Sequence, residues 1–286
     1  MKNIALISLT FIFSCGNPQN KYELVYKHQH KVESERTSDL YLQLVGLFEL
    51  DPTSLNSFGS SQTNDFVITV PGTPEKIGTL ELKTDSIIFD SANTIDINNS
   101  QGTRVNKINL SFRRNRSENL SHGRLSWFIE KFGGKIYLRV RDLESDRVKT
   151  FKGFKYFELN PEFILKGKVT YWDEPELTTF PTALNMDQDN NVVGKVSFTF
   201  KGQEYELLMD SKYGTKFADE TSGDETYGAG RYMRVWPDED GVVFLDFNYA
   251  YNPPCSFSEF TTCIFPPKEN HLPFKVLAGE MGEEKN

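Results

Sequence analysis

Residues 195–208 read KVSFTFKGQEYELL. Apolar and polar side chains alternate strictly over residues 195–200. Alternation with a period of two is typical of a β-strand that buries one face. Lys201-Gly202-Gln203 then interrupts the pattern before residues 204–208, which are again strand-like. A short break containing glycine between two such runs predicts an antiparallel hairpin, so this stretch favours a mostly β fold.

Strands of the same kind are predicted on both sides of this hairpin. They lie at residues 65–70, 78–83, 85–89, 108–112, 136–141 and 168–171. Gly133-Gly134 predicts a hairpin turn, and residues 231–236 and 242–247 are predicted to form a further hairpin around residues 237–241. Many short strands at close spacing indicate a β-sandwich. We expect an N-terminal β-sandwich-like unit followed by a second antiparallel β unit, either a sandwich or a partly open barrel.

The beginning of the first unit allows two interpretations. Within residues 34–50, Leu40, Leu44 and Leu47 fall on one face of a helix. Leu40, Leu42 and Leu44 also alternate, which is the pattern of a strand. The sequence therefore allows either a short N-terminal helix or a strand at these residues.

Composition and motifs exclude several classes of partner. The chain has 286 residues and a net charge of -8, and nucleic-acid binding needs clustered Lys and Arg. Residues 187–191 begin like a calcium loop, but Val192 and Phe198 stand where that loop needs Gly and Glu. The sequence contains four histidines and no phosphate-binding or zinc-protease motif. We expect no nucleic acid, no metal and no cofactor.

The N-terminus indicates export. Residues 4–13 form an apolar run, which is too short to span a bilayer because a spanning helix needs about 20 residues. The run therefore predicts a signal peptide. Ile12-Phe13-Ser14-Cys15 resembles the lipobox of bacterial lipoproteins, in which the cysteine sulfur receives a diacylglycerol and cleavage leaves that cysteine first. The resemblance implies that Cys15 is lipidated, with acyl chains such as palmitate, and that a membrane of the cell envelope is a partner. Gly16 is not the aspartate associated with inner-membrane retention in some bacteria, which favours the outer membrane.

These observations divide the chain into four predicted segments. Residues 1–14 are a signal peptide, and residues 15–33 are the lipidated cysteine and a polar tether. Residues 34–160 hold the N-terminal helix or strand and the β-sandwich-like unit. Residues 161–286 form the C-terminal β unit, with residues 161–181 as the seam between the two.

Two cysteines remain after Cys15. Cys255 and Cys263 are separated by seven residues, and a pair of cysteines in an exported chain predicts a disulfide. The alternative is a metal or reactive-thiol site that also uses Glu269 and His271.

Two C-terminal blocks, residues 217–232 and 244–273, are rich in Gly, Pro, Asn, Thr and Tyr. Long ordered loops of this composition are usually functional or cover a core. The pattern FADETSGDETYGAGRY followed by LDFNYAYNPPC resembles the bacterial and archaeal domain-of-unknown-function family 1684. The N-terminal LVGLF at residues 44–48 also matches, so the resemblance covers nearly all of the chain after Cys15. It implies no particular activity.

A second resemblance concerns residues 45–142. Phe58-Gly59-Ser60 followed by Asn64-Asp65 is similar to the start of a forkhead-associated β-sandwich, a domain that binds phosphothreonine. Ser60 stands where those domains carry an arginine. The resemblance therefore implies a shared fold without phosphopeptide recognition.

The C-terminal blocks supply the candidate ligand-binding residues. These are polar or aromatic side chains that can line one pocket: Asp219, Thr226, Tyr227, Arg231, Asp246, Asn248, Tyr251 and Asn252. Arg231 offers a planar fork for a carboxylate or phosphate, and tyrosine rings suit sugars or peptides. We expect a binding or structural module of the cell envelope with a small polar, carbohydrate or peptide ligand. One alternative is a hydrolase that uses carboxylates and Arg231. The other is a purely structural Asp219–Arg231 ion pair.

Overall fold

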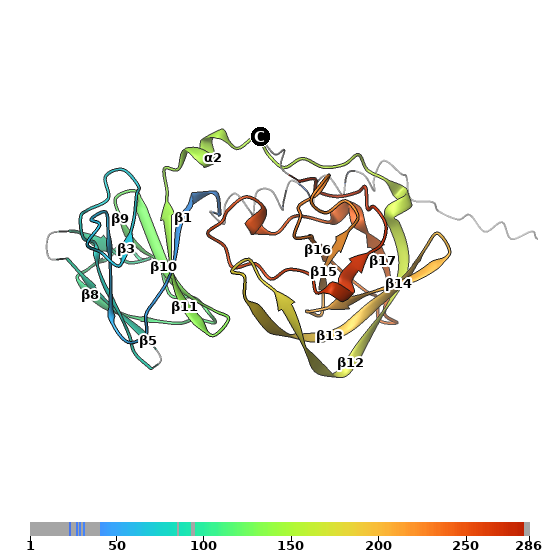
Figure 1. Ribbon diagram of the computed structural model, residues 1–286, viewed down its shortest axis with the longest axis horizontal. Coiled ribbons are helices and arrows are strands. Elements are labelled where there is room, and N and C mark those ends of the chain that lie inside the picture. The colour runs from blue at the N-terminus through green and yellow to red at the C-terminus, as the bar shows by residue number, and fades with distance from the viewer. Residues whose placement is uncertain are drawn as a thin grey trace, which may run out of the picture.

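The computed structural model describes residues 41–84, 86–92 and 95–282, together with Glu23, Lys27, Gln29 and Lys31. The predicted signal peptide, Cys15 and most of the predicted tether lie outside the described residues. Figure 1 shows two β units side by side, joined by a segment that runs along one edge of both. The expected mostly β fold is confirmed.

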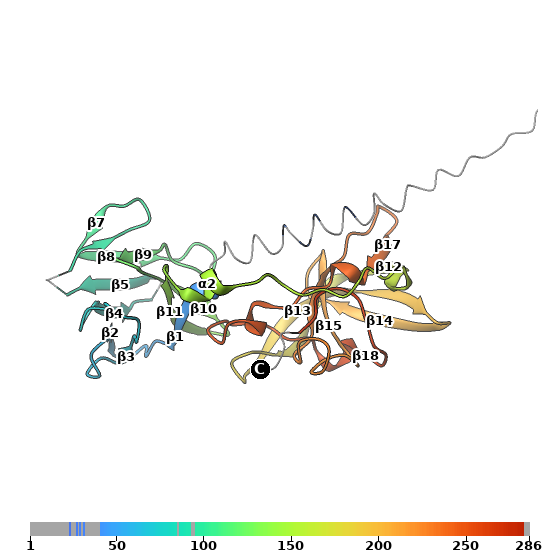
Figure 2. The ribbon, with the colours of Figure 1, turned by 90° about the horizontal axis from the view of Figure 1, so that it is seen from above.

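The N-terminal unit consists of two sheets that face each other (Figure 2). The six-stranded sheet has the order β1 (Leu44–Glu49), β11 (Lys135–Asp142), β10 (Leu125–Phe132), β9 (Leu120–His122), β6 (Ile97–Asn98) and β7 (Arg104–Val105). The five-stranded sheet has the order β3 (Phe66–Val67), β2 (Leu55–Gly59), β4 (Gly78–Leu82), β5 (Ser86–Ser91) and β8 (Lys107–Ser111). Strands β2 and β3 pair in parallel, and the other pairs in these sheets are antiparallel.

Aromatic rings fill the space between these sheets. Phe58, Phe89 and Trp127 are fully buried, and the rings of Phe58 and Trp127 lie 5.5 Å apart in an edge-on arrangement. Such contacts stabilise a core by burial and by favourable ring geometry. They hold the two sheets together.

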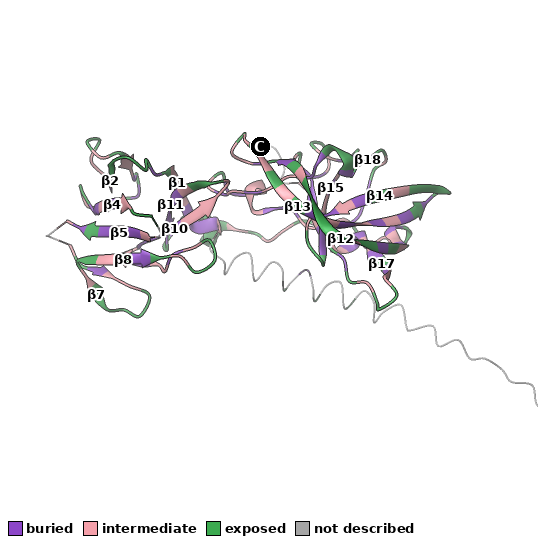
Figure 3. Ribbon diagram, turned by 90° about the horizontal axis from the view of Figure 1, so that it is seen from below, coloured by how far each residue is buried: buried purple, intermediate pink, exposed green. Residues whose placement is uncertain are grey.

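The C-terminal unit also has two sheets. The larger has the order β14 (Gln203–Met209), β13 (Asp187–Phe200), β12 (Ile164–Pro181) and β17 (Val242–Asp246). The smaller has the order β16 (Arg231–Arg234), β15 (Gly214–Asp219) and β18 (His271–Leu272), with β18 parallel to β15. Short 3-10 turns accompany them: η3 (Phe247–Tyr249), η4 (Pro254–Ser256) and η5 (Lys268–Asn270). Buried and exposed residues mix along the strands of this unit (Figure 3), as expected for sheets with one face on a core.

The connection between the units begins with the short helix α2 (Asp146–Thr150) and ends at η2 (Pro161–Phe163). Between them the chain pairs with the C-terminal tail. The amide of Phe157 donates to the carbonyl of Gly279, and the amide of Met281 donates to the carbonyl of Lys155, each at 2.9 Å. Residues 279–281 therefore brace the connection.

Several local predictions are confirmed and others are wrong. The turns at Gly133-Gly134 and Lys201-Gly202 are present. Residues 44–49 are the strand β1, preceded by η1 (Tyr41–Gln43), so the helix interpretation is wrong for this part. The backbone of β1 pairs with β11 in antiparallel register, and such pairing is available to a strand and not to a helix.

Two predictions of chain organisation also fail. The predicted seam at residues 161–181 is mostly the single long strand β12, because its edges pair with both β13 and β17. The predicted hairpin of residues 231–236 with 242–247 does not form. Strand β16 pairs with β15, and β17 pairs with β12. Each of the two strands therefore pairs with an earlier strand of the unit and not with the other. Among the described residues, no helix is both long and apolar enough to cross a membrane.

Candidate functional site

The most buried charged residue among the predicted site residues is Arg231. Its side chain and that of Asp219 are each 0% exposed, and Arg231 Nη2 lies 2.7 Å from Asp219 Oδ2. The guanidinium also donates to the backbone carbonyls of Val276, at 3.0 Å, and Ala278. Burial lowers the pKa of Arg231, whereas the charge of Asp219 acts in the opposite direction. Arg231 thus joins β16 to the tail of the chain.

The other oxygen of Asp219 organises the loop that follows β15. It accepts hydrogen bonds from the backbone amide of Thr221 at 2.8 Å and from its hydroxyl at 2.6 Å. The hydroxyl of Thr221 lies 2.7 Å from that of Thr226, and both threonines are buried. These contacts give a reason for the Asp, Thr and Arg of residues 217–232. Their side chains form hydrogen bonds with backbone groups that have no strand partner in an irregular loop.

The structure therefore corrects part of the predicted ligand site. Asp219, Thr226 and Arg231 are sealed inside the C-terminal unit and cannot contact a ligand from solvent. The hydrolase alternative requires Arg231 to contact a substrate, and the fully buried Arg231 cannot do so. Asp219 and Arg231 form the buried ion pair that the structural alternative predicted.

Asp246 and Asn248 form a second structural group. Asn248 is buried, and its side-chain amide donates to Asp246 at 2.7 Å and to the carbonyl of Asn160 at 3.0 Å. The amide of Asn160 donates back to Asn248 Oδ1 at 2.9 Å. Asp246 thus caps η3, Asn248 fixes the end of the connection, and neither lines the cavity described below.

The predicted tyrosines also turn away from a common pocket. The hydroxyl of Tyr227 donates to the carbonyl of Cys255 at 3.3 Å, and burial raises the pKa of Tyr227. The ring of Tyr251 lies 5.9 Å from that of Tyr232 in an edge-on contact. Tyr227 and Tyr251 therefore pack against the C-terminal loops.

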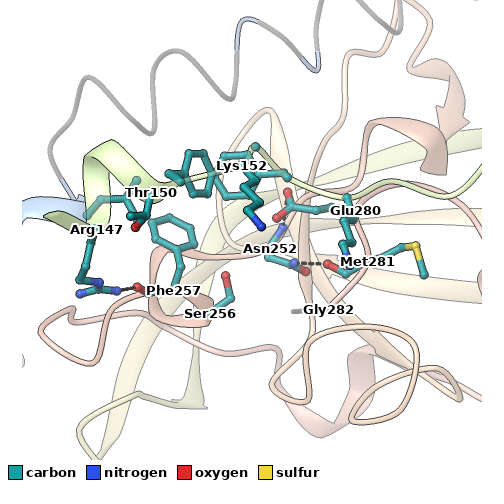
Figure 4. Close-up of a pocket in the computed structure, with 14 residues that line it drawn as sticks. Arg147, Thr150, Lys152, Asn252, Ser256, Phe257, Glu280, Met281 and Gly282 are labelled. Carbon is teal, nitrogen blue, oxygen red and sulfur yellow. Dashed lines mark hydrogen bonds between the residues drawn. The ribbon is translucent and has the colours of Figure 1, made fainter. Parts of the chain in front are cut away.

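Asn252 is the predicted residue that does line a cavity. The cavity has a volume of about 560 Å³ and lies between α2, the connection and the C-terminal loops (Figure 4). The backbone amide of Asn252 donates to Glu280 Oε2 at 3.2 Å, and its side-chain amide donates to the carbonyl of Met281 at 2.7 Å. These contacts fix the side of the cavity formed by the tail.

The opposite side of this cavity is basic and aromatic. Arg147, Lys152 and Lys155 line it, and Arg147 donates to the carbonyl of Phe257 (Figure 4). The rings of Phe154 and Phe257 lie 5.5 Å apart. Glu280 is buried and contributes one negative charge, so the lining carries an excess of positive charge.

Sequence reasoning missed these residues because they lie in a segment without strand or helix periodicity. Residues 151–155 read FKGFK, in which aromatic and basic residues alternate around a glycine. This alternation of aromatic and basic residues is the sequence signal that could have identified the segment as a candidate ligand site. Only the pairing of this segment with residues 279–281 shows that it faces Asn252.

A smaller cavity of about 320 Å³ lies where the two β units meet. Arg139 and Glu130 of the N-terminal unit line it together with Lys216, Tyr232 and Cys263 of the C-terminal unit. Arg139 Nη1 lies 2.8 Å from Glu130 Oε2, and Nη2 donates to the carbonyl of Phe260 at 2.7 Å, which links the units.

Lys216 is paired with Asp210 at this second cavity. Burial, with the charge of Arg234 adding to it, lowers the pKa of Lys216 to about 8. The ion pair with Asp210 works against this shift. The amine thus lies in an environment that favours its neutral form more than water does.

The cysteines beside this cavity do not carry the predicted disulfide: Cys255 and Cys263 are both free. They are nevertheless neighbours, because the amide of Cys255 donates to Cys263 Sγ at 3.2 Å. His271 lies on β18, and its Nε2 is 3.9 Å from Glu220 Oε1. Among the described residues, no group of three metal-ligating side chains occurs. The alternative of a metal site at the cysteines therefore gains no support.

The fold and these cavities define a two-unit β protein whose C-terminal unit is closed around a buried arginine. Residues 149–281 match the family described as "Protein of unknown function (DUF1684)", and the chain belongs to this family. The match contains the Asp219–Arg231 pair and most of the 560 Å³ cavity.

A solved structure was also found. An uncharacterised protein of Haloarcula marismortui, determined by solution NMR, is 31% identical, and the alignment covers 48% of this chain and 80% of that chain with a TM-score of 0.39. The comparison with curated proteins gives no match.

Proposed function

We propose that this chain is a membrane-anchored binding protein of the cell envelope, and that its ligand is a small, negatively charged polar molecule. The observation that carries the proposal is the 560 Å³ cavity, which gathers Arg147, Lys152 and Lys155 in a protein of net charge -8. Clustered cations on an acidic protein attract anions by charge complementarity.

The size and lining of the cavity fit a small molecule. Ligand sites typically have about 300–1,000 Å³, lie at junctions between structural units and combine aromatic walls with a few polar groups. Here Phe151, Phe154 and Phe257 supply the walls, and Asn252 and Ser256 supply polar groups. This combination suits an acidic sugar or a peptide with a free carboxylate, because rings can pack against the apolar faces while the cations contact the carboxylate.

The side of the cavity next to Asn252 is rigidly held. Asn252 is held by two hydrogen bonds to residues 280 and 281, and the buried Glu280 lines the cavity next to it. A wall fixed in this way keeps the shape of the cavity constant, so a ligand of matching shape binds without a cost of reorganisation.

The anchor is proposed from the sequence. Lipidation of Cys15 would place the described units outside the cytoplasm at a membrane surface, with the outer membrane favoured. More than one acyl chain makes such anchoring stable.

Ligand binding can be tested with matched probes. Isothermal titration of the full-length chain carrying Cys15→Ser with glucuronate and glucose, and with acetyl-phenylalanine and its amide, compares acidic with neutral forms. We expect measurable binding of one acid and at least tenfold weaker binding of its neutral partner.

Variants identify the cavity in the same experiment. Lys152→Gln should weaken binding of the acid about tenfold, which corresponds to about 1.4 kcal/mol. Lys166→Gln is the control, because Lys166 lies on β12 and does not line this cavity. Equal binding of acid and neutral probe, or equal loss in both variants, would contradict the proposal.

The anchor has a separate test. Cys15→Ala should move the protein from the membrane fraction to the soluble fraction of a bacterial host, and metabolic labelling with a palmitate analogue should be lost. A variant that still sediments with membranes would exclude lipid anchoring without affecting the ligand proposal.

A further inference from the structure

A tight turn of the N-terminal unit gathers basic side chains. It follows β8, and residues 113–116 read RRNR. The amide of Arg113 donates to the carbonyl of Arg116 at 2.9 Å, and the amide of Arg116 donates back at 3.4 Å. Arg114 and Asn115 are therefore the two central residues of the turn. Arg113 and Arg114 are both exposed, so the turn presents two guanidinium groups to solvent.

A third cation lies beside this turn. The amide of Lys131, on β10, donates to the carbonyl of Asn115 at 2.7 Å. Its ammonium lies 4.2 Å from the centre of the ring of Phe112, which precedes the turn. The attraction of a cation to an aromatic face holds the ammonium there. We call Arg113, Arg114 and Lys131 together the basic turn patch.

The charges of the basic turn patch are not used inside the protein. Among the described residues, no acidic side chain forms an ion pair with it. The acidic residues that follow most closely in the chain have other partners: Glu118 accepts a hydrogen bond from Ser100 at 3.1 Å, and Glu130 pairs with Arg139. In a protein of net charge -8, these three cations are available to an anionic partner.

The backbone of Arg114 gives an independent indication. Its φ is 59°, in the left-handed region that glycine adopts freely and that is unfavourable for a residue with a Cβ. Lys201, in a turn of the C-terminal unit, has a similar φ of 49°, but its ammonium lies 3.4 Å from Glu162. Strained residues that serve no internal contact are candidates for a functional role. Arg114 fits this description, and Lys201 does not.

We propose that the basic turn patch contacts the anionic headgroups of a membrane surface. A small free anion is best bound by donors that converge in a cavity, and the patch lines neither of the two cavities described above. A lipid surface presents many phosphate groups in one plane, which suits cations spread along an exposed turn.

The membrane setting rests on the anchor in the proposed function. A chain held at a membrane needs only a weak further contact, because anchoring raises the effective concentration of the patch at the lipid. The chain as a whole is acidic, so an anionic surface repels most of it. The basic turn patch therefore selects the part of the N-terminal unit that faces the lipid.

Vesicle sedimentation tests this contact without the anchor. The full-length chain with Cys15→Ser is mixed at low salt with vesicles of phosphatidylcholine alone, or of phosphatidylcholine with about one third phosphatidylglycerol. We expect binding to the anionic vesicles to be at least about fivefold stronger. Because this chain lacks Cys15, the result does not depend on lipidation.

Salt separates the two forms of attachment. A wash with about 0.5 M salt should release the Cys15→Ser chain from anionic vesicles, because charge contacts are screened. The same wash should leave an acylated chain on the membranes of a bacterial host, because burial of acyl chains does not depend on charge. Failure of the anchor and failure of the patch are therefore distinguishable.

Matched variants identify the patch. Arg114→Gly removes one charge and relieves the left-handed backbone, so binding to anionic vesicles should fall about fivefold while the midpoint of thermal unfolding does not fall. Lys201→Gly removes the same charge from a similar backbone conformation in the other unit, and binding should stay within about twofold. Arg114→Lys keeps the charge and should keep most of the binding.

Three results would overturn the proposal. The first is equal binding to neutral and anionic vesicles. The second is an equal loss in Arg114→Gly and Lys201→Gly, which would assign the effect to net charge. The third is release from the vesicles by inorganic phosphate at a lower ionic strength than by chloride, which would indicate a discrete site for a free anion.

Discussion

The two β units have different interiors. The N-terminal unit is filled by Phe58, Phe89 and Trp127, which contact one another through ring faces and edges. The C-terminal unit has a large apolar core as well, but a completely buried Arg231 with Asp219 lies beside it. The N-terminal unit also buries Arg139 and Asp142, but their partners Glu130 and Arg124 are partly exposed, whereas both members of the Asp219–Arg231 pair are 0% exposed. The interior of the C-terminal unit therefore depends more on directed polar contacts.

This difference has physical consequences. Apolar burial depends on area and shape and tolerates exchanges of similar volume. A buried ion pair depends on the position of each donor and acceptor, because an unpaired buried charge is very unfavourable. The C-terminal unit should therefore be the more sensitive to conservative changes, and the following variants test that expectation.

Removal of the buried cation should have the largest effect. Arg231→Met leaves Asp219 uncompensated and leaves the carbonyls of Val276 and Ala278 without their donor. We expect the free energy of unfolding to fall by about 3–5 kcal/mol, as measured by urea denaturation. Arg231→Lys keeps the charge but lacks the planar fork, so it should restore only part of this loss. A full recovery would show that charge alone matters.

A matched pair of glycines tests backbone tightness in the two units. Gly230 has φ +85°, and an added Cβ would lie 2.6 Å from the carbonyl oxygen of Phe217. Gly102 has φ +75° with open space around it. Gly230→Ala should cost about 2–3 kcal/mol, because strain and a clash combine, and Gly102→Ala about 1 kcal/mol. Thermal unfolding of both variants measures the difference, and equal costs would weaken the comparison.

A conservative change in the apolar interior should have a smaller effect. Leu80 is fully buried in the N-terminal unit. Leu80→Met preserves volume and should lower the free energy of unfolding by less than about 1.5 kcal/mol. A loss as large as that of Arg231→Met would show that the N-terminal unit is no more tolerant than the C-terminal one.

The smallest expected effect is a pH dependence at the junction of the units. Burial lowers the pKa of Lys216 to about 8 from its ordinary value of 10.5. Between these values the unfolded chain binds more protons than the folded chain, so the free energy of unfolding should rise with pH. Below pH 8 both states hold the proton, and this contribution is constant.

We expect an increase of about 1 kcal/mol from pH 8 to pH 10 relative to Lys216→Met, because partial exposure and Asp210 moderate the effect. Urea denaturation at several pH values gives both curves. Parallel curves for the two proteins would assign the pH dependence to other groups.

Much of the fold could be predicted from local patterns. Alternation at residues 195–208 and glycine at residues 133–134 and 202 specify strands and turns through nearest neighbours. The partner of β17 could not be predicted in this way. Its alternation is compatible with several neighbours, and pairing with β12 depends on packing across the whole unit.

The candidate site was only partly predictable for a similar reason. Composition identified the C-terminal loops as important, and Asn252 does line the 560 Å³ cavity. Polar residue types alone do not show whether a side chain satisfies the backbone or faces solvent. Asp219 and Arg231 satisfy the interior, whereas Lys152 and Lys155, in an unpatterned segment, line the cavity.

The amino-acid sequence by itself determined that this chain is mostly β and which residues form its family signature, because strand periodicity, turn residues and motifs are local properties. Only the tertiary structure decided that Arg231 is enclosed, that the FKGFK segment faces Asn252 and that Cys263 faces a cavity. Enclosure and access depend on which distant segments pack together, and contacts between residues far apart in the chain set them.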